Sequence, residues 1–432
     1  MNIDELYHIY LQNPHVQTDT RQLKSGDLFF ALKGPNFNGN RFAEMAIANG
    51  AAFAVIDEPA FAIPGKTILV NDVLTALQEL AHFHRQQLDI PFIAITGSNG
   101  KTTTKELVHV VLSEKYKVYT TQGNLNNHIG IPLTILSIKN DAQIAVIEMG
   151  ANHLHEIEGY CKIAEPTHGL ITNCGKAHLE GFGSIEGVRK GKGELFDYLR
   201  KANGAAFIMK DYPYLEEMSR GIPSVISYGT KNADITGKAI TEGRFLQVQV
   251  TGLQTNLSIS TQLAGDYNLP NVLAAVAIGN YFGVVATGIQ SAIEHYQPSN
   301  SRSQWVKAES NQILLDAYNA NPSSMKLAIE NFASIAGGKK ILMLGNMAEL
   351  GTETIPEHEA LVNQIRSHYW EAVVLVGKAF EPFKEEFLYF ETAAAAAEWA
   401  GQQQFENSFF LIKGSRSTQM EKILAAFHLP TS

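Results

Sequence analysis

Cysteine is scarce in this sequence. Only two of its 432 residues, Cys161 and Cys174, are cysteines. That number is too small for a disulfide framework, and no spacing of cysteine and histidine resembles a zinc site. Such a composition is typical of a reducing compartment, so we expect a cytoplasmic protein.

Charged residues are also few, and basic ones are the minority. They make up 18% of the chain, and 43 acidic residues against 34 basic ones give a net charge of −9. A negative balance argues against a protein whose main partner is a nucleic acid or an anionic membrane. Any phosphate that this protein binds must therefore be held by a local set of donors and cations.

The sequence has no evident targeting or membrane segment. Its first residues, MNIDELYHIY, lack the basic and apolar regions of a signal peptide. The stretch from Tyr267 to Ile293 is uncharged and long enough to span a bilayer, but its apolar core, Val272 to Gly279, is short. Polar residues and glycines interrupt the rest, which predicts a buried helix followed by a turn and no membrane insertion.

The length and the order of patterns predict an α/β protein. At about 150 residues per domain, 432 residues correspond to about three domains. A polar, proline-containing linker at 295–303 separates the last of them. We expect a small α/β domain over 1–86, a central parallel-sheet domain over 87–297, and a C-terminal Rossmann-like domain over 298–432.

Apolar runs mark the expected strands of each domain. After Tyr228 the pattern alternates between polar and apolar residues, which predicts a small antiparallel patch at the end of the central domain. The expected strands are 27–33, 51–57 and 67–70, then 92–96, 143–148, 169–173 and 205–209, and finally 313–319, 339–346, 372–378 and 408–415.

A glycine-rich loop joins the buried strand 92–96 to a helix that runs to Glu114. Backbone N–H groups of such a loop cradle phosphate oxygens, its lysine neutralises them, and its hydroxyl binds Mg²⁺. Ile95 stands where the usual first glycine of this motif would be, which leaves a shorter GxxGKT pattern. We still expect ATP or GTP binding. The loop residues expected at the nucleotide are Gly97, Ser98, Asn99, Gly100, Lys101, Thr102 and Thr103.

Two further residues follow the ends of predicted strands. Glu148 ends the strand 143–148, and His178 comes shortly after the strand 169–173. The carboxyl ends of parallel strands meet at one edge of the sheet, so both side chains could bind magnesium beside the phosphate loop. Taken alone, each is equally explained as a solvated strand end or a loop histidine.

Eight sequence blocks, in order along the whole chain, resemble the Mur ligase family. These blocks are TGSNGKTTTKE (96–106), GNLNNHIGIPLT (123–134), IEMGA (147–151), ITNCGKAHLEGFGS (171–184), KGELF (192–196), DAYNANPSSM (316–325), LGNMAELG (344–351) and KGSRS (413–417). The segment 19–34 is similar to the muramoyl-nucleotide domain that some members share. The resemblance implies an ATP-dependent amide ligase that forms ADP. A monomer fits a large enzyme of three domains.

The block 316–325 resembles the branch of the family that adds D-alanyl-D-alanine to UDP-N-acetylmuramoyl-tripeptide. That resemblance implies an acyl-phosphate intermediate and a role in peptidoglycan precursor synthesis, and thereby in cell-wall biogenesis and cell division. Two alternatives are a ligase of the MurE or folylpolyglutamate-synthase kind and, in another class, a phosphate-loop ATPase that ligates nothing.

The resemblance also implies roles for single residues. Thr102, Glu148, His178 and Lys192 would surround magnesium, with two metal sites, and Lys192 would be carbamylated by CO₂. Without the resemblance, the sequence predicts that Lys192 is a surface lysine in the basic run that also contains Arg189 and Lys190. ATP contacts are implied for Asn268, Asn271, Arg302 and Asp316. Substrate contacts are implied for Thr20, Arg21, Asn124, Asn126, Asn127, Asn319 and Asn321, although the asparagines are equally explained as turn and cap formers.

Two positions depart from the family pattern. His155 replaces a common glycine, and Tyr267 replaces a histidine that usually precedes Asn268. Neither change removes a group that the chemistry needs, but the second makes the adenine contacts less certain.

Overall fold

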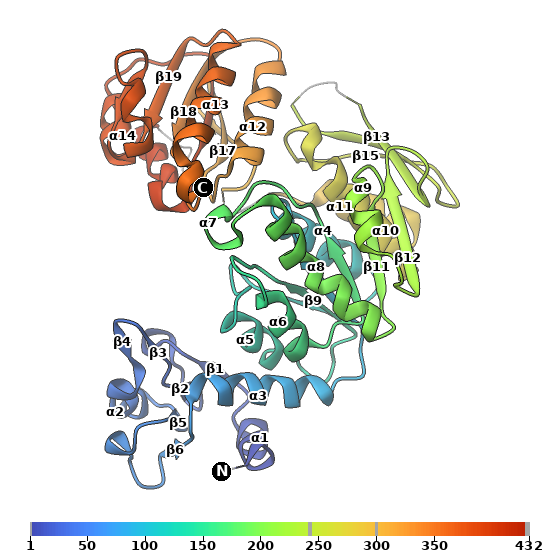
Figure 1. Cartoon of the computed structure of the whole chain (residues 1–432), viewed down its shortest axis with the longest axis vertical. Coiled ribbons are helices and arrows are strands. Elements are labelled where there is room, and N and C mark those ends of the chain that lie inside the picture. Colours follow the sequence, from blue (N-terminus) through green and yellow to red (C-terminus); the bar gives the residue numbers. More distant parts are fainter. Residues whose placement is uncertain (1, 241–243, 299–300, 428–432) are drawn as a thin grey trace.

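Three main sheets are formed by successive stretches of the chain and lie along an arc (Figure 1). The computed structural model describes residues 2–240, 244–298 and 301–427. The N-terminal sheet lies at one end of the arc, the C-terminal sheet at the other, and the largest sheet between them. Ser299 and Asn300, which belong to the predicted linker 295–303, lie outside the described residues.

The N-terminal unit is a four-stranded parallel sheet with the order β1-β2-β5-β6. Its three predicted strands are confirmed with shorter bounds. Its elements are α1 (Ile3–Gln12), β1 (Val16–Gln17), β2 (Leu28–Phe30), β3 (Lys33–Gly34), β4 (Phe37–Asn38), α2 (Ala43–Ala48), β5 (Phe53–Ile56), β6 (Thr67–Leu69) and α3 (Val73–Gln86).

Helices α1 and α3 attach this unit to the central one. The buried Arg85 of α3 donates to the carbonyl of Ala164 at 2.8 Å, and its guanidinium lies 3.9 Å from the Phe92 ring centroid. On α1, the Tyr10 hydroxyl donates to the carbonyl of Leu136 at 2.6 Å. A single hydrophobic core extends from these helices into the central sheet.

The central unit has nine strands in the order β15-β14-β13-β12-β11-β10-β7-β9-β8. Strands β7 to β13 are mutually parallel where they pair, and β14 and β15 continue the same sheet antiparallel. The predicted antiparallel patch is therefore confirmed as the edge of this sheet. Its strands are β7 (Phe92–Thr96), β8 (Val118–Thr120), β9 (Ile144–Glu148), β10 (His168–Ile171), β11 (Ala205–Met209), β12 (Ser224–Gly229), β13 (Ile235–Ile240), β14 (Gln247–Thr251) and β15 (Leu257–Ser260).

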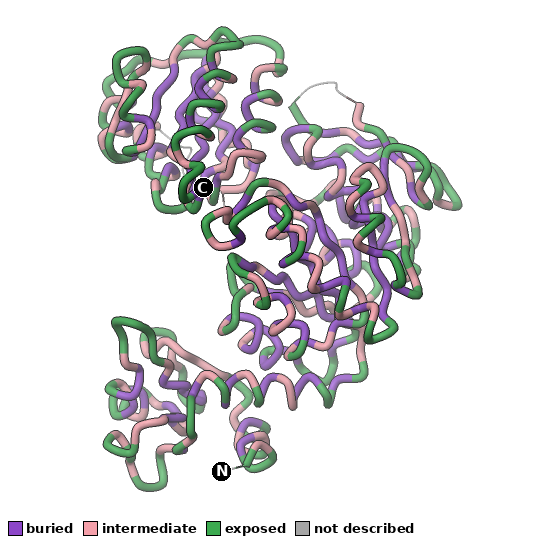
Figure 2. The backbone as a smooth tube through the Cα atoms, in the orientation of Figure 1, coloured by how far each residue is buried: buried purple, intermediate pink, exposed green. Residues whose placement is uncertain are grey.

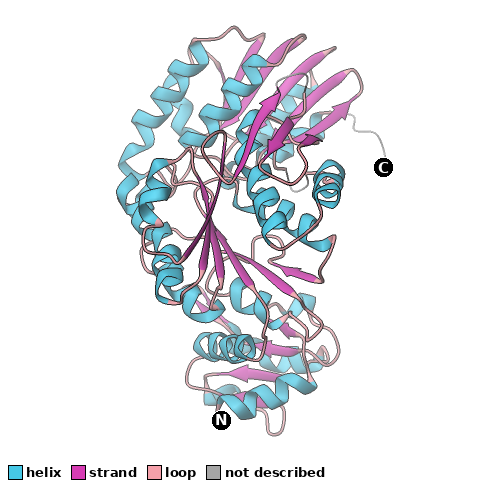
Figure 3. Cartoon of the chain, turned by 90° about the vertical axis from the view of Figure 1, so that its right-hand side faces the viewer, coloured by secondary structure: helices cyan, strands magenta, loops and turns pink. Residues whose placement is uncertain are grey.

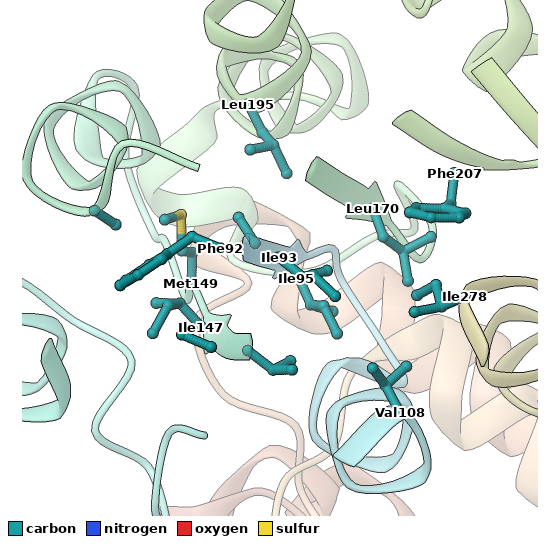
Figure 4. Close-up of a cluster of buried hydrophobic side chains, with 14 of the residues drawn as sticks. Phe92, Ile93, Ile95, Val108, Ile147, Met149, Leu170, Leu195, Phe207 and Ile278 are labelled. Atoms are coloured by element: carbon teal, nitrogen blue, oxygen red, sulfur yellow. The ribbon is translucent and has the colours of Figure 1, made fainter. Parts of the chain in front are cut away.

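Helices cover both faces of this sheet (Figure 3). Every residue of β7 is buried, and Figure 4 shows its side chains between Leu195 of one helix layer and Val108 and Ile278 of the other. The helices are α4 (Lys101–Ser113), α5 (Gly130–Leu136), α6 (Glu156–Ala164), α7 (Leu179–Phe182), α8 (Ile185–Lys201), α9 (Pro213–Met218), α10 (Leu269–Tyr281) and α11 (Ala286–His295).

The uncharged stretch 267–293 is a buried helix, as predicted, but the turn after it leads into a second helix. Helix α10 is buried over most of its length against α4 and the sheet, which explains why it carries no charge (Figure 2). Gly283, with φ of 71°, forms the turn before α11. Among the residues that the structure describes, no helix combines the length and hydrophobicity needed to cross a membrane.

The C-terminal unit has six strands in the order β16-β17-β21-β18-β19-β20. All pairs are parallel except β16 with β17. The four predicted strands are confirmed, whereas the edge strands β16 and β20 were not expected. The elements are β16 (Gln304–Ala308), β17 (Asn311–Asp316), α12 (Pro322–Ser334), β18 (Lys339–Gly345), α13 (Thr354–Arg366), β19 (Ala372–Val376), β20 (Leu388–Phe390), α14 (Ala393–Gly401) and β21 (Ser408–Lys413).

The packing of the central core predicts a large effect of truncating Leu195. This side chain is fully buried between α8 and the sheet, so Leu195→Ala should lower the free energy of unfolding by about 2–5 kcal/mol. Leu11→Ala on the half-exposed side of α1 is the matched control and should change it little. Urea unfolding, monitored by circular dichroism, measures the free energy of unfolding of both variants. An equal decrease in the two variants would contradict the packing described here.

Candidate active site

The phosphate loop, residues 97–102, requires glycine at two positions. Gly97 and Gly100 have φ of 142° and 80°, values that side-chain-bearing residues rarely adopt. A Cβ atom on Gly97 would overlap Thr172 Oγ1, and one on Gly100 would lie 2.5 Å from Asn271 Oδ1. The backbone of this loop is therefore closely packed against Thr172 and Asn271, and only glycine fits at these two positions.

A second loop fixes the phosphate loop from the side. We call residues 172–175, which follow β10, the clamp loop. The carbonyl of Asn173 accepts from Ser98 N at 2.9 Å, and its side-chain oxygen accepts from Asn99 N at 3.1 Å. Thr172 Oγ1 donates to Asn99 O at 2.6 Å, and Ser98 Oγ donates to Gly175 O at 2.9 Å. Sequence reasoning did not single out Asn173, although it lies inside a family block.

Lys101 and Thr102 begin helix α4 at the end of this loop. Lys101 Nζ donates to the carbonyl of Gly97 at 2.7 Å. Burial lowers the pKa of the Lys101 ammonium from its usual value, while the Glu148 carboxylate opposes that shift. Thr102 is buried, and its neighbour Thr103 is more exposed. The arrangement is that of a loop and helix N-terminus suited to bind phosphate.

A pocket of about 900 Å³ opens in front of the phosphate loop. It is lined by residues of the central and C-terminal units, and the structure brings most of the predicted site residues to it. The predicted residues that line it are Ser98, Asn99, Gly100, Lys101, Thr102, Thr103, Asn124, Asn126, Asn127, Glu148, His178, Asn268, Asn271, Arg302, Asp316, Asn319 and Asn321.

Four predicted residues do not line this pocket. Gly97, the first residue of the phosphate loop, does not reach the pocket surface, and Lys192 lies in the protein interior. Thr20 and Arg21 belong to a short 3₁₀ turn of the N-terminal unit, where Arg21 forms an exposed ion pair with Asp19 at 2.7 Å. Their contact with a nucleotide sugar stays a prediction.

Glu148 offers a buried carboxylate oxygen to the pocket. Its Oε1 accepts from Asn126 Nδ2 at 2.8 Å, while Oε2 is buried and has no hydrogen-bond partner among the described residues. A buried, unsatisfied carboxylate oxygen is costly unless a cation or a donor faces it. The site therefore fits Mg²⁺ at this oxygen. The Asn127 side chain stabilises its own loop, because its Oδ1 accepts from the backbone N–H of Gly130 at 2.9 Å.

His178 reaches the pocket from the loop after β10. It has φ of 53° and immediately precedes α7, and its Nδ1 is in close contact with Glu349 Oε2 of the C-terminal unit. The His178 ring holds the pKa of the Glu349 carboxyl below its usual value. Among the described residues no group of three or more histidine, cysteine, aspartate or glutamate side chains could hold a metal. A magnesium ion here would need the Thr102 hydroxyl and phosphate or water oxygens as further ligands.

Lys192 is fully buried in α8. Its Nζ donates to the carbonyl of Ala151 at 2.8 Å and lies 5.1 Å from the Phe182 ring centroid. Burial, with a smaller effect from the nearby Lys101 ammonium, lowers the pKa of Lys192 to about 7. Lys192 is therefore a buried lysine with a lowered pKa, and the alternative of a surface lysine is wrong.

Asn268 and Asn271 connect the start of α10 to α4. Asn268 Nδ2 donates to Ala264 O at 2.7 Å and its Oδ1 accepts from Asn271 Nδ2 at 2.8 Å. Thr104 Oγ1 of α4 donates to Asn271 Oδ1 at 3.1 Å. These amides hold the pocket wall, and their contact with adenine stays a prediction.

The C-terminal unit contributes the opposite wall. Asp316 Oδ2 pairs with the buried Lys413 Nζ at 2.5 Å, and its Oδ1 accepts from Ser303 N at 3.1 Å. The Arg302 guanidinium lies 3.8 Å from the centroid of the Tyr318 ring. Tyr318 was not singled out from the sequence, although it lies in the block 316–325.

Asn321 joins the two walls. It is the N-cap of α12, with its Oδ1 accepting from Ser324 N at 2.9 Å, and its Nδ2 donates to Asn99 Oδ1 of the phosphate loop at 2.8 Å. Asn319 Oδ1 accepts from the next backbone amide, that of Ala320. The expectation of a cap is thus confirmed for Asn321, which in addition contacts the phosphate loop.

The two departures from the family pattern have local explanations. His155 is the N-cap of α6 with φ of 69°, a conformation in which glycine is common. The hydroxyl of Tyr267 lies 2.9 Å from Ser303 Oγ and so connects α10 to the start of the C-terminal unit.

The parallel sheet and glycine-rich loop define a nucleotide-binding enzyme of the phosphate-loop class. Comparison with known families gives matches to the Mur ligase family, catalytic domain, over residues 14–86, to the Mur ligase middle domain over 95–279, and to the Mur ligase, glutamate ligase domain over 301–416. The chain belongs to the Mur ligase family and is an ATP-dependent ligase.

Individual relatives are similar over nearly the whole chain. The UDP-N-acetylmuramoyl-tripeptide--D-alanyl-D-alanine ligase of Bacillus subtilis is 34% identical, over 98% of this chain and 96% of its own. A crystal structure of MurF from Acinetobacter baumannii matches with a TM-score of 0.86 at 31% identity, over 95% of this chain and 92% of its own. MurF from Thermotoga maritima in complex with ADP matches with a TM-score of 0.86 at 25% identity, over 96% and 97%.

The glycine geometry predicts that Gly100→Ala weakens nucleotide binding. An alanine there must adopt a left-handed conformation and displace Asn271, so we expect ADP affinity to fall about tenfold or more. Gly159→Ala, on α6 with open space around the added Cβ atom, is the control and should bind ADP as the wild type does. Calorimetric titration with Mg²⁺ and ADP measures both, and unchanged affinity of Gly100→Ala would refute the assigned loop geometry.

Proposed function

We propose that this protein joins D-alanyl-D-alanine to UDP-N-acetylmuramoyl-tripeptide and cleaves ATP to ADP and phosphate, in the synthesis of peptidoglycan precursors. The observation that carries the proposal is the single pocket that the phosphate loop shares with Asn319 and Asn321 of the C-terminal unit. ATP on one wall and an incoming amine on the other would meet there. Similarity to the Bacillus subtilis ligase of that specificity supports the choice of substrates.

Each unit has a proposed task. Residues 1–86 bind the muramoyl nucleotide, with Thr20 and Arg21 at the nucleotide sugar. Residues 87–297 bind ATP, with Asn268 and Asn271 at adenine, and Asn124, Asn126 and Asn127 at the tripeptide. Residues 298–432 bind the dipeptide, with Asn319 and Asn321 near it, and place Arg302 and Asp316 against ATP.

The first step activates the tripeptide carboxylate. A carboxylate is a poor electrophile, so its oxygen attacks the γ-phosphorus of ATP to give an acyl phosphate, with ADP as the leaving group. In phosphoryl transfer the protein mainly positions the reactants and neutralises charge. The phosphate-loop amides and the Lys101 ammonium serve that role in this pocket.

Magnesium would be held by Thr102, Glu148 and His178. The unsatisfied buried Oε2 of Glu148 supports this assignment. When bound, the cation supplies charge neutralisation at the phosphate oxygens. A carbamate on Lys192 would provide a further anionic ligand for a second ion, and the lowered pKa of this buried amine supports its reaction with CO₂.

The second step forms the amide bond. The α-amine of the dipeptide, with a pKa of about 8, loses a proton and attacks the acyl phosphate carbon, and phosphate leaves. Alignment of the two groups can supply about 7–11 kcal/mol of the barrier. Water must be excluded because it would hydrolyse the acyl phosphate. The contact of Asn321 with Asn99 supports a role for the C-terminal unit in closing the pocket.

We place the reaction in the cytoplasm and assign it to a monomer. A supply of ATP and the two free, buried cysteines are compatible with a reducing compartment. Within the described residues each of the three main sheets packs against helices of the same chain, which is compatible with a protein that acts alone.

Phosphate release with defined substrates tests the proposed function. We expect release from ATP to require both UDP-N-acetylmuramoyl-tripeptide and D-alanyl-D-alanine, with the amide product detected by mass spectrometry. A preference for a single amino acid over the dipeptide would instead indicate a ligase of the MurE kind. Release that needs neither substrate would indicate an ATPase without ligation and would exclude the proposal.

The proposed carbamate has a separate test. With ¹³C-bicarbonate, the wild type should give a carbamate carbon signal by NMR that Lys192→Ala lacks, and activity of the variant should fall about 100-fold or more. Lys190→Ala, a change at an exposed residue of the same helix, should keep both signal and activity. An unmodified Lys192 together with full activity of Lys192→Ala would rule the carbamate out.

A further inference from the structure

His178 and Glu349 meet across the junction of the central and C-terminal units. His178 follows β10 of the central sheet, and Glu349 follows β18 of the C-terminal sheet. Nδ1 of the histidine ring is in close contact with Oε2 of the carboxylate, without the alignment of a hydrogen bond, and both residues line the pocket. The His178 side chain is 18% exposed, so the carboxylate is its main charged neighbour on that side.

The backbone of Glu349 also contacts this region. Its carbonyl accepts from Glu180 N at 3.2 Å, which places Glu349 against the first turn of α7. Glu349 has φ of 61°, a left-handed conformation that is costly for a residue with a side chain. Such a conformation persists where surrounding contacts hold it, and here those contacts are with His178 and Glu180.

The pairing determines which ring nitrogen can bind a cation. A carboxylate beside Nδ1 keeps the proton of the neutral ring on that nitrogen. The lone pair is then on Nε2, the nitrogen that does not pair with Glu349. A histidine fixed in this way is a better-oriented cation ligand than one that rotates freely.

We propose that Glu349 is a positioning residue for His178, so that cation binding beside the phosphate loop is complete only when the C-terminal unit is docked. The proposal rests on the proposed function in one respect, since it assumes that His178 faces a nucleotide-bound divalent cation. It adds that a residue of another unit, which lines the pocket but forms no hydrogen bond with the phosphate loop among the described residues, orients that ligand.

A neighbouring ion pair allows the orientation of the His178 ring to be tested separately from the docking of the C-terminal unit. Lys176 Nζ of the central unit pairs with Glu357 Oε1 of α13 at 2.5 Å. This pair joins the same loop to the same C-terminal unit, but neither residue contacts His178 in any described hydrogen bond or ion pair. Glu357→Gln therefore weakens docking without changing the partner of the histidine ring.

The experiment measures Mn²⁺ binding in the presence of ADP by electron paramagnetic resonance, which needs neither tripeptide nor dipeptide. We compare the Mn²⁺ affinity of the wild type with that of Glu349→Ala, Glu349→Gln and Glu357→Gln. Glu349→Ala should weaken Mn²⁺ affinity about 10–100-fold. Glu349→Gln should stay closer to the wild type, because its amide oxygen can still lie beside Nδ1. Glu357→Gln should match the wild type within about twofold.

Turnover gives a second readout. With all substrates, Glu349→Ala should lower kcat and leave the KM for the dipeptide nearly unchanged. Because Glu349 is about half exposed, its variants should fold, which thermal melting followed by circular dichroism checks.

Three results would overturn the inference: unchanged Mn²⁺ affinity in Glu349→Ala, an equal loss in Glu357→Gln, or an equal loss in Glu349→Gln. The second would indicate docking alone, and the third would indicate that the carboxylate itself binds the cation. Failure of the wild type to use D-alanyl-D-alanine would refute the proposed function, whereas the Mn²⁺ comparison would still decide the role of Glu349.

Discussion

The site depends on the hydrogen bonds between Asn173 and the phosphate loop. Asn173 accepts from the amides of Ser98 and Asn99, so the loop backbone is held from outside and not by its own side chains. Close approach of the clamp loop is possible only because Gly97 has no Cβ atom. The amides that remain are thereby preorganised for anionic oxygens, which reduces the reorganisation needed when phosphate binds.

The same stretch of chain after β10 connects the phosphate loop to the rest of the molecule. It carries His178 into the pocket and pairs with Glu349 and Glu357 of the C-terminal unit. The N-terminal unit is attached through Arg85 and a shared core instead. In a protein with a net charge of −9, the cations that line the pocket are few and specifically placed, chiefly Lys101, Arg302 and Lys413, and Lys192 is buried in α8. Local burial and pairing, and not a basic surface, therefore determine anion binding.

Much of this arrangement could be predicted from the sequence because its signals are local. The apolar run 205–209 is strand β11 to the residue, and the glycine-rich loop lies between a strand and a helix as expected. The edge strand β16 was missed because it mixes polar and apolar residues, and β20 was missed because it is only three residues long; both are only partly buried. Asn173 and Glu349 were missed for a different reason. Their roles come from partners far away in the chain, and no local pattern of residues records such a contact.

The central claim is that this pocket transfers the γ-phosphoryl group of ATP to a substrate carboxylate. Transfer of ¹⁸O from the labelled terminal carboxylate of the tripeptide to released phosphate tests it most directly. Because the carboxylate oxygen that attacks phosphorus stays with the phosphate when the amine displaces it, each phosphate should carry one ¹⁸O atom from a fully labelled carboxylate. Phosphate without ¹⁸O, in the presence of amide product, would contradict the account.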